Sequence, residues 1–262
     1  MQADLAKQRY TLEYLQLANS TFAYNSGTQA REEAPLKHIT AENINIEGGG
    51  FIYSPTELAT KINALSFNQP AGVNINKGVL ELTATDTEIN IKQVILESAN
   101  GSYINATSTL PIDLFNGNAK GAIEATAIAH INKRDLKGFV TKEQAESLNS
   151  LPDSLLDASI ILHGSRAKTL IENVNLTIPR IATINANGEF SYMNNKRAEG
   201  NIRFNGTITD ASPFTGAAST QATPISLTGD AKIIGSLCSA NIEIKGNGDG
   251  SILAIYDTKR DF

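Results

Sequence analysis

The sequence predicts an all-β protein: a long antiparallel meander of strands, curled into an elongated trough, with one short helix near residues 141–149. Apolar and polar residues alternate with a period of two, for example at Leu80, Leu82 and Ala84. This period indicates strands with one buried and one solvated face. Short polar turns separate the alternating runs and can reverse the chain into an antiparallel neighbour. Aromatic residues make up only 6% of the chain and Trp is absent, whereas a closed sandwich usually fills its centre with large aromatics.

The N-terminal half divides into predicted strands and tight turns. Residues 10–24 predict a strand, a turn near Asn19 and Ser20, and a returning strand. A surface loop is expected at residues 25–37, where the sequence is polar and contains Pro35. The next strand pair is expected to turn at the glycines 48–50. Residues 54–67 fit either a helix, from the spacing of Leu58, Ile62 and Leu65, or a strand, and the surrounding meander favours the strand after a short turn at Pro55. Further turns are predicted at residues 76–78, 85–87 and 100–101.

The C-terminal half contains the one predicted helix. Thr141 and Gln144 can form a capping box, Ala145 and Leu148 supply an apolar stripe, and Pro152 stops the helix. Strands are predicted on both sides of it, at residues 119–131, 158–163, 174–179, 183–190, 200–206, 224–235, 240–246 and 250–256. The whole chain should hold about 16 to 20 strands. We expect residues 1–262 to form one continuous extended sheet, with residues 25–37 and 212–223 as surface loops.

Composition excludes several classes of function. The net charge of −5 is spread along the chain without acidic blocks, which argues against a nucleic-acid partner. Cys238 is the one cysteine, so it forms no internal disulfide, and it is interpreted as a small strand residue. No apolar run approaches the roughly 18 residues of a membrane helix. The first residues lack the apolar segment of a signal peptide, which indicates either a cytosolic protein or a piece of a longer one.

Catalytic and cofactor sites are not expected. His38, His130 and His163 are far apart in the sequence, and none has a second ligand at metal-binding spacing. Nucleophile, P-loop and dinucleotide motifs are missing. The glycines 48–50 could cradle a phosphate, but no predicted helix follows them, and a hairpin turn fits better. We therefore expect a protein that is not an enzyme and needs neither cofactor nor metal.

The inward-facing apolar residues are the candidate functional residues. They are slim and aliphatic, and a continuous apolar strip of this kind needs a ligand or a partner. Acyl chains suit it because they ask for no polar groups. Packing against an opposing sheet is the structural alternative. The predicted lining comprises Ile44, Ile46, Leu65, Phe67, Val73, Ile75, Leu80, Leu82, Ile89, Ile91, Ile160, Leu162, Leu176, Ile178, Ile202, Phe204, Ile225, Leu227, Ile242 and Ile244.

Two other classes of protein fit parts of the pattern. A surface adhesin or other structural β-repeat protein is also rich in Asn and Thr, but it would close its apolar face into a core and bind through loops. An enzyme acting on polysaccharide would be expected to show exposed aromatics and paired carboxylates, and the sequence shows no such arrangement.

Residues 39–115 resemble the middle of the TamB-like proteins of Bacteroidetes, members of the wider AsmA-like group. The resemblance lies in residues 44–46, 65–67, Gly72 with the alternating strand after it, and the run 94–104. It continues through residues 127–136, 160–164 and 252–257, so it covers nearly the whole chain as a similarity of pattern and order. The chain departs from the family pattern at residues 97–99, where Glu-Ser-Ala stands in place of a Thr-Pro pair.

The resemblance implies a fold and a function. Family members form a long antiparallel sheet curled into a trough, are anchored at the inner membrane of Gram-negative bacteria and cross the periplasm. They work with an outer-membrane barrel protein of the TamA or BamA type, and they are thought to carry phospholipids or to help outer-membrane protein assembly. Because full family members are several times longer and begin with a membrane helix, the chain is expected to be an internal segment.

Overall fold

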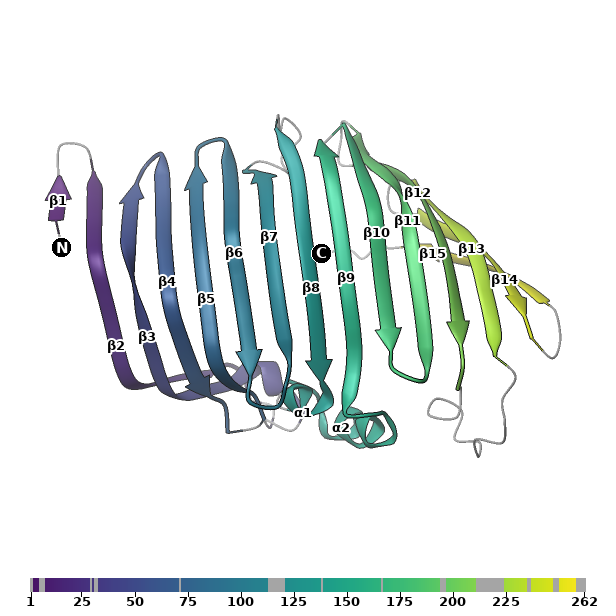
Figure 1. Cartoon of the computed structure of the whole chain (residues 1–262), viewed down its shortest axis with the longest axis horizontal. Coiled ribbons are helices and arrows are strands. Elements are labelled where there is room, and N and C mark those ends of the chain that lie inside the picture. Colours follow the sequence, from purple (N-terminus) through teal and green to yellow (C-terminus); the bar gives the residue numbers. More distant parts are fainter. Residues whose placement is uncertain are drawn as a thin grey trace. The chain divides into compact units, whose positions relative to one another are not determined.

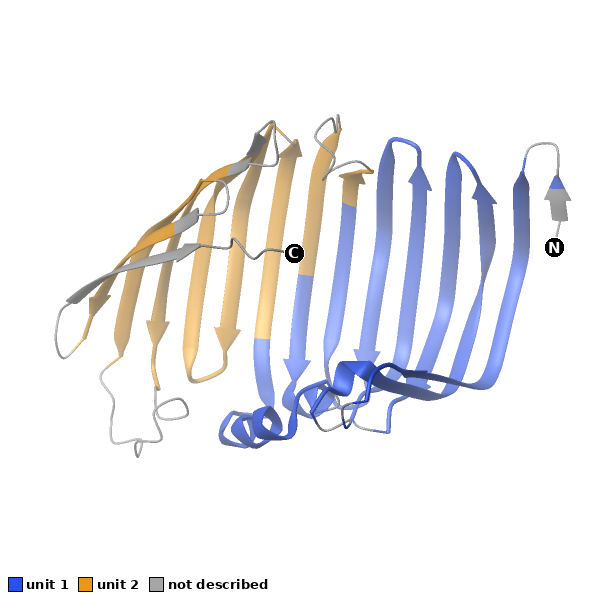
Figure 2. Cartoon of the chain, turned by 180° about the vertical axis from the view of Figure 1, so that it is seen from behind, with its two compact units in different colours: residues 1–108, 128–156 blue, residues 109–127, 157–262 orange. Residues whose placement is uncertain are grey.

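The structure is a computed structural model. It describes residues 2–4, 8–28, 30, 33–70, 72–112, 121–137, 139–165, 167–193, 197–210, 224–234, 237–246 and 250–257. The chain divides into two compact units (Figure 2). Unit 1 comprises residues 1–108 and 128–156, and unit 2 comprises residues 109–127 and 157–262.

The predicted all-β antiparallel meander is confirmed. Over the described residues the strands follow sequence order, from β1 to β15, without a crossover (Figure 1). Strands β1 to β6 pair antiparallel in unit 1, and β9 to β15 do so in unit 2. The strands are β1 (Gln2–Asp4), β2 (Arg9–Asn25), β3 (His38–Ser54), β4 (Glu57–Asn68), β5 (Asn74–Thr85), β6 (Glu88–Ser98), β7 (Tyr103–Pro111), β8 (Ala122–Asn132), β9 (Ser154–Ser165), β10 (Lys168–Ile178), β11 (Ala182–Met193), β12 (Arg197–Ile208), β13 (Ile225–Ile234), β14 (Leu237–Lys245) and β15 (Gly250–Asp257).

The predicted helix is also confirmed. Helix α2 (Lys142–Ser147) follows the N-cap Thr141, and the 3-10 helix η2 (Leu148–Ser150) continues it. The capping box forms as expected: the Gln144 amide N–H donates to Thr141 Oγ1 at 3.4 Å, and the Thr141 N–H donates to Gln144 Oε1 at 2.9 Å. Both ends of the motif thereby satisfy amides that the first helical turn leaves without partners.

A second short helix, α1 (Lys133–Leu136), was not predicted, because four residues carry too little periodicity to be seen in a sequence. Its Asp135 is buried and accepts hydrogen bonds from the Ser98 hydroxyl and from Asn100 Nδ2. These contacts hold α1 against the turn between β6 and β7, within unit 1.

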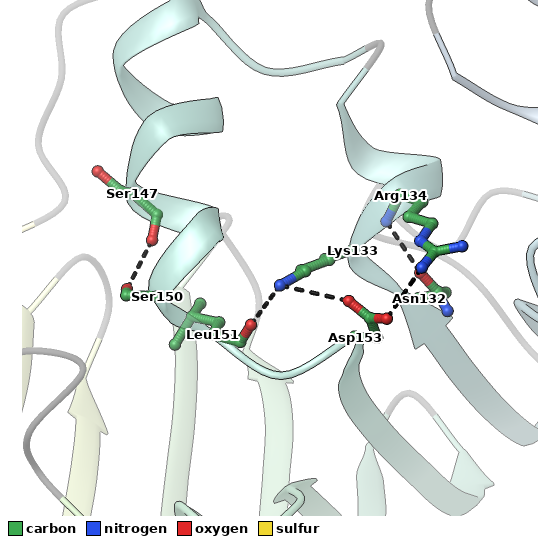
Figure 3. Close-up of polar contacts among 7 residues, drawn as sticks. All are labelled: Asn132, Lys133, Arg134, Ser147, Ser150, Leu151 and Asp153. Atoms are coloured by element: carbon green, nitrogen blue, oxygen red, sulfur yellow. Dashed lines mark hydrogen bonds and ion pairs between the residues drawn. The ribbon is translucent and has the colours of Figure 1, made fainter. Parts of the chain in front are cut away.

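A cluster of polar contacts joins the two ends of the segment that contains α1 and α2 (Figure 3). Lys133 Nζ donates to the Leu151 carbonyl at 2.5 Å and lies 3.4 Å from Asp153 Oδ1. Arg134 Nη2 reaches the other carboxylate oxygen of Asp153 at 3.1 Å. The main chain joins the same two ends, because the Lys133 N–H donates to the Asp153 carbonyl at 2.9 Å. The helices therefore lie between β8 and β9 without interrupting the strand order.

Three predicted turns are wrong, because the chain runs straight through them as strand. Strand β2 continues past Asn19 and β3 continues past the glycines 48–50, and each is 17 residues long. Strand β5 continues past residues 76–78. Each site is a β-bulge instead, where the pairing register shifts. The 15 strands described are accordingly fewer and longer than predicted.

Close packing between backbones explains the glycines in β3. A Cβ atom at Gly48 would collide with the Lys61 carbonyl oxygen, and one at Gly49 would collide with the Glu13 carbonyl oxygen. Gly50 has a φ of +59°, which a residue with a side chain adopts at a cost. The glycines thus allow a bulge between two neighbouring strands, and their local sequence looks like that of a turn.

Other predicted turns lie at or near observed ones. Strand β3 passes to β4 through the two residues Pro55 and Thr56, and turns lie at residues 86–87 and 99–102. Among the described residues of the predicted loop 25–37, residues 26–34 lie outside strands, and the 3-10 helix η1 (Pro35–Lys37) ends the loop. The predicted loop at residues 212–223 lies outside the described residues.

Within each unit, the extensive contacts between described strands are those between neighbours in the sheet. Three described aliphatic side chains are buried, those of Val73, Ile123 and Ile181. The other described Ile, Leu and Val side chains are half-buried or exposed, so the apolar surface of the described strands is only partly covered.

Candidate functional site

The strand register of unit 2 gathers apolar side chains on one face. In an antiparallel pair, residues directly opposite each other point to the same side. Leu176 is opposite Ile184, and the same row continues through Gly206 and Leu227 to Ile244. The neighbouring rows are built in the same way. This face, called here the apolar face of unit 2, holds all ten of the lining residues predicted there: Ile160, Leu162, Leu176, Ile178, Ile202, Phe204, Ile225, Leu227, Ile242 and Ile244.

The register adds residues that the sequence did not single out. Ile184 and Ile208 belong to this face, and their period-two alternation in β11 and β12 would have identified them. Ile171 and Val174 also share it, although they are three residues apart. A bulge between them restores the face, since Ile171 is opposite Leu162 and Val174 is opposite Ile160. Alternation alone would have assigned these two residues to opposite faces.

The apolar face of unit 2 is open over the described strands. Leu176 and Ile184 each expose 38% of their surface, and most of the remaining large side chains are half-buried by their neighbours in the sheet. None of the ten lining residues is fully buried. The face is therefore a continuous aliphatic surface on six strands, β9 to β14.

Unit 1 has an apolar face built by the same rule. Ile62 is opposite both Gly48 and Leu80, and Leu80 is opposite Val94. The predicted lining residues that share this face are Ile44, Ile46, Leu65, Phe67, Ile75, Leu80, Leu82, Ile89 and Ile91.

Val73 is the one predicted lining residue of unit 1 that lies outside a strand. It precedes β5 in a tight turn, where the Gln69 N–H donates to the Val73 carbonyl at 2.7 Å. Its side chain is buried, with 7% of its surface exposed, whereas the other nine are half-buried or exposed.

The opposite face of unit 2 is polar and ordered by side-chain hydrogen bonds. Asn175, Asn185 and Asn205 lie in one row across three strands. Asn175 Nδ2 donates to Asn185 Oδ1 at 2.6 Å, and Asn185 Nδ2 is 3.5 Å from Asn205 Oδ1. The row continues to Thr228, whose Oγ1 donates to Glu243 Oε2 at 3.4 Å. Polar groups are thus matched across strands on one face, as apolar groups are on the other.

The polar face of unit 1 carries ion pairs across neighbouring strands. Glu81 lies between Lys61, at 3.6 Å, and Lys92, at 2.9 Å. The hydrogen bond from Lys92 is the largest cause that lowers the pKa of Glu81 below its usual value of 4.5, and the charges of Lys92 and Lys61 act in the same direction. A further pair joins Lys77 to Glu97 at 2.6 Å.

A hollow lies on the polar side of unit 2. It has a volume of about 690 Å³, and its lining includes His163, Glu189, Asn201, Arg203 and Asp230. His163 Nδ1 is 3.6 Å from Glu172 Oε2 at the same hollow. A ligand of the apolar face would consequently lie on an open surface, on the other side of the sheet from this hollow.

Metal and membrane sites give no further candidate. Among the residues that the structure describes, no three His, Cys, Asp or Glu side chains come together as metal ligands. In the same residues, no helix has the length and apolarity needed to cross a bilayer. Comparison of the chain with protein-family models, curated proteins and solved structures found no match.

Proposed function

We propose that the apolar faces bind the acyl chains of phospholipids, and that the chain is a periplasmic segment of a TamB-like or AsmA-like protein of the cell envelope. The observation that carries this proposal is the apolar face of unit 2. Its ten predicted lining residues share one side of the sheet, and none of them is fully buried.

The chemistry of the face favours acyl chains over polar ligands. Its side chains are mainly those of Ile, Leu, Val, Ala and Gly, with Phe190 and Phe204. A polar ligand placed here would lose hydrogen bonds to water and find few replacements. An acyl chain loses none, and it removes apolar surface from water at about 25 cal/mol per Å². A contiguous exposed apolar surface of this kind favours a membrane component or a partner as its ligand.

The proposal includes a location and a partner, both carried by the sequence resemblance. The parent protein would be anchored in the inner membrane of a Gram-negative bacterium, and this segment would stand in the periplasm. Phospholipid would pass along the apolar groove between the inner and outer membranes. An outer-membrane barrel protein of the TamA or BamA type would act with the full-length protein, in lipid transport or in outer-membrane protein assembly.

Charge on the apolar face tests the proposal. Leu82→Glu and Ile91→Glu should each abolish the co-purification of phospholipid, measured by mass spectrometry of the purified protein. The melting temperature should change little, because on a face open to water the new carboxylate stays hydrated. Thr83→Glu is the matched control, since Thr83 lies on β5 next to Leu82 but faces the polar side, and this variant should keep its lipid.

Two results would contradict the proposal. Unfolding of both glutamate variants would mean that the face is a closed core, as in a structural β-repeat or adhesin, because burying an unpaired carboxylate costs several kcal/mol. A wild-type protein that carries no phospholipid after purification and acquires none from vesicles would remove lipid binding altogether.

A further inference from the structure

Four polar side chains that line the hollow on the polar side of unit 2 have no side-chain partner among the described residues. They are Asn187, Asn201, Arg203 and Asp230, and they come from the neighbouring strands β11, β12 and β13. None of them makes a side-chain hydrogen bond or ion pair with a residue that the structure describes. Arg203 and Asp230 lie directly opposite each other in the strand register, yet they form no ion pair within the described chain.

The polar groups around these four side chains are paired. At the rim of the hollow, Lys168 Nζ lies 2.7 Å from Glu189 Oε2, and His163 Nδ1 lies 3.6 Å from Glu172 Oε2. The next row of the same face is the asparagine row, which is joined by its own hydrogen bonds. The hollow is therefore the place on this face where polar side chains are free to bind a ligand.

We propose that this hollow binds a neutral saccharide through its four unpartnered side chains. The site lies on the opposite side of the sheet from the apolar face, because Arg203 stands between Ile202 and Phe204 in β12 and neighbours along a strand point to opposite sides. It is therefore separate from acyl-chain binding and does not depend on it.

The hydrogen-bonding groups of the hollow match those of a sugar. A hydroxyl group both donates and accepts. The Arg203 guanidinium only donates, the ionised Asp230 carboxylate only accepts, and each asparagine amide does both. Donors and acceptors thus lie side by side, which suits a ring that carries several hydroxyl groups. Hydrogen bonds to the two charged groups would be the stronger ones.

The charges of the hollow favour an uncharged ligand. The charge of Arg203 is balanced by that of Asp230 directly across the strands. An anion such as phosphate at Arg203 would be repelled by Asp230 and by the rim carboxylates of Glu172 and Glu189. A cation at Asp230 would be repelled by Arg203 in the same way. A neutral saccharide meets neither repulsion.

The size of the hollow and its one aliphatic group on this face also fit a saccharide. Its volume of about 690 Å³ lies within the range of about 300–1,000 Å³ that is usual for small-molecule sites. Because neighbouring strands are about 4.8 Å apart, side chains on β11, β12 and β13 span about 10 Å, which suits one or two sugar rings. Leu170 lines the hollow in the same row as His163 and Glu189, and it offers a contact for the C–H groups of a ring.

A microarray of neutral and acidic oligosaccharides, followed by NMR titration of the full chain with the best neutral ligand, tests the site. Wild type should bind at least one neutral oligosaccharide. Arg203→Ala and Asp230→Ala should each raise the dissociation constant at least about tenfold, because each removes hydrogen bonds to a charged group. Glu243→Ala is the matched control, since it removes a carboxylate from the same face, opposite Thr228 and outside the hollow. Its dissociation constant should equal that of wild type, and melting temperatures would show whether each variant is folded.

Inorganic phosphate should not displace the saccharide, and the Leu82→Glu variant should still bind it, so the acyl-chain proposal and this one can fail separately. Binding of no neutral oligosaccharide, displacement by phosphate, or an equal loss of affinity in Glu243→Ala would each overturn the proposal. Binding that survives both Arg203→Ala and Asp230→Ala would place the saccharide on another surface and overturn it equally.

Discussion

At the scale of single residues, glycines on the apolar face of unit 2 make room for larger neighbours. Gly229 is directly opposite Phe204, whose ring lies over it. A Cβ atom at Gly229 would lie 2.7 Å from Phe204 Cζ and would also collide with the Asn241 carbonyl oxygen. The aromatic ring replaces the packing that the glycine lacks, so this position tolerates no side chain of its own.

The expected effect of Gly229→Ala is therefore opposite to the usual one. A glycine inside a strand normally costs about 0.5–1 kcal/mol relative to alanine. Here alanine should destabilise the protein by about 1–3 kcal/mol, because Phe204 must leave its position. Gly246→Ala is the control, since the nearest atom to its Cβ would be Ile225 Cγ1 at an ordinary 3.5 Å. Urea unfolding of the two variants measures the difference, and equal stabilities would refute the argument.

The ion pairs of Glu81 predict a pH dependence at acid pH. Because Lys92 lowers the pKa of Glu81 below 4.5 in the folded protein, the ionised carboxylate adds stability at pH values above its pKa in the unfolded chain. That stability is lost as the pH falls through the lower pKa of the folded protein. Glu81→Gln should therefore lose less stability than wild type on acidification below pH 4.5. The side chain is partly exposed to solvent, so the difference in stability should be small and should shrink at high salt. Thermal melts at several pH values and salt concentrations check this.

At the scale of elements, the sequence predicted the kind of structure better than its boundaries. Period-two alternation identified the strands, and the capping box at Thr141 and Gln144 identified α2, since both signals come from residues close together in the chain. Bulges were not recognisable, because a glycine run that permits close backbone approach and one that permits a turn have the same composition. The pairing partner distinguishes the two, and it comes from a different strand.

The residues of the candidate site were likewise predictable where the signal is local to one strand. In unit 2 every predicted lining residue lies on one face, because β11 to β14 have no register shift between them and alternation is preserved. Ile184 and Ile208 were omitted although alternation would have identified them. Ile171 and Val174 could not be identified in this way, because a bulge separates them. Alternation therefore predicts a face correctly only between bulges.

Removal of the α2 cap should loosen this helix locally. Thr141→Ala loses the side chain that accepts from the Gln144 N–H, and such a loss typically costs about 0.5–2 kcal/mol. Hydrogen exchange at the amides of Gln144 and Ala145 should become faster, while exchange in the strands stays unchanged. Thr141→Ser keeps the hydroxyl acceptor and should exchange like wild type. Unchanged exchange in the alanine variant would mean that the cap contributes nothing.

At the scale of the whole molecule, the extensive contacts of each described strand within a unit are those with its neighbours in the sheet. Stability then arises from successive strand-to-strand contacts, as in repeat proteins, and no distant segment is needed to complete a central core. The few buried apolar residues agree with this organisation. The two faces can accordingly differ in chemistry along the sheet, since each row of side chains is set by local pairing.

This organisation predicts that the hairpin formed by β4 and β5 can be deleted without unfolding the rest of the sheet. Deletion of residues 57–87 would join Thr56 directly to Glu88, and Glu88-Ile89 repeats the sequence pattern of Glu57-Leu58. The new pairing between β3 and β6 keeps the register. Tyr53 would lie opposite Ile89 in place of Leu58. Five residues further along each strand, Gly48 would lie opposite Val94 in place of Ile62. The shortened protein should fold with strand-type circular dichroism and a cooperative melt, whereas a deletion of β4 alone, residues 57–73, should not, because it reverses the direction of every later strand. A protein built in this way can change its length by two strands at a time. Duplication or loss of a hairpin would lengthen or shorten the sheet, and each face would keep its chemistry.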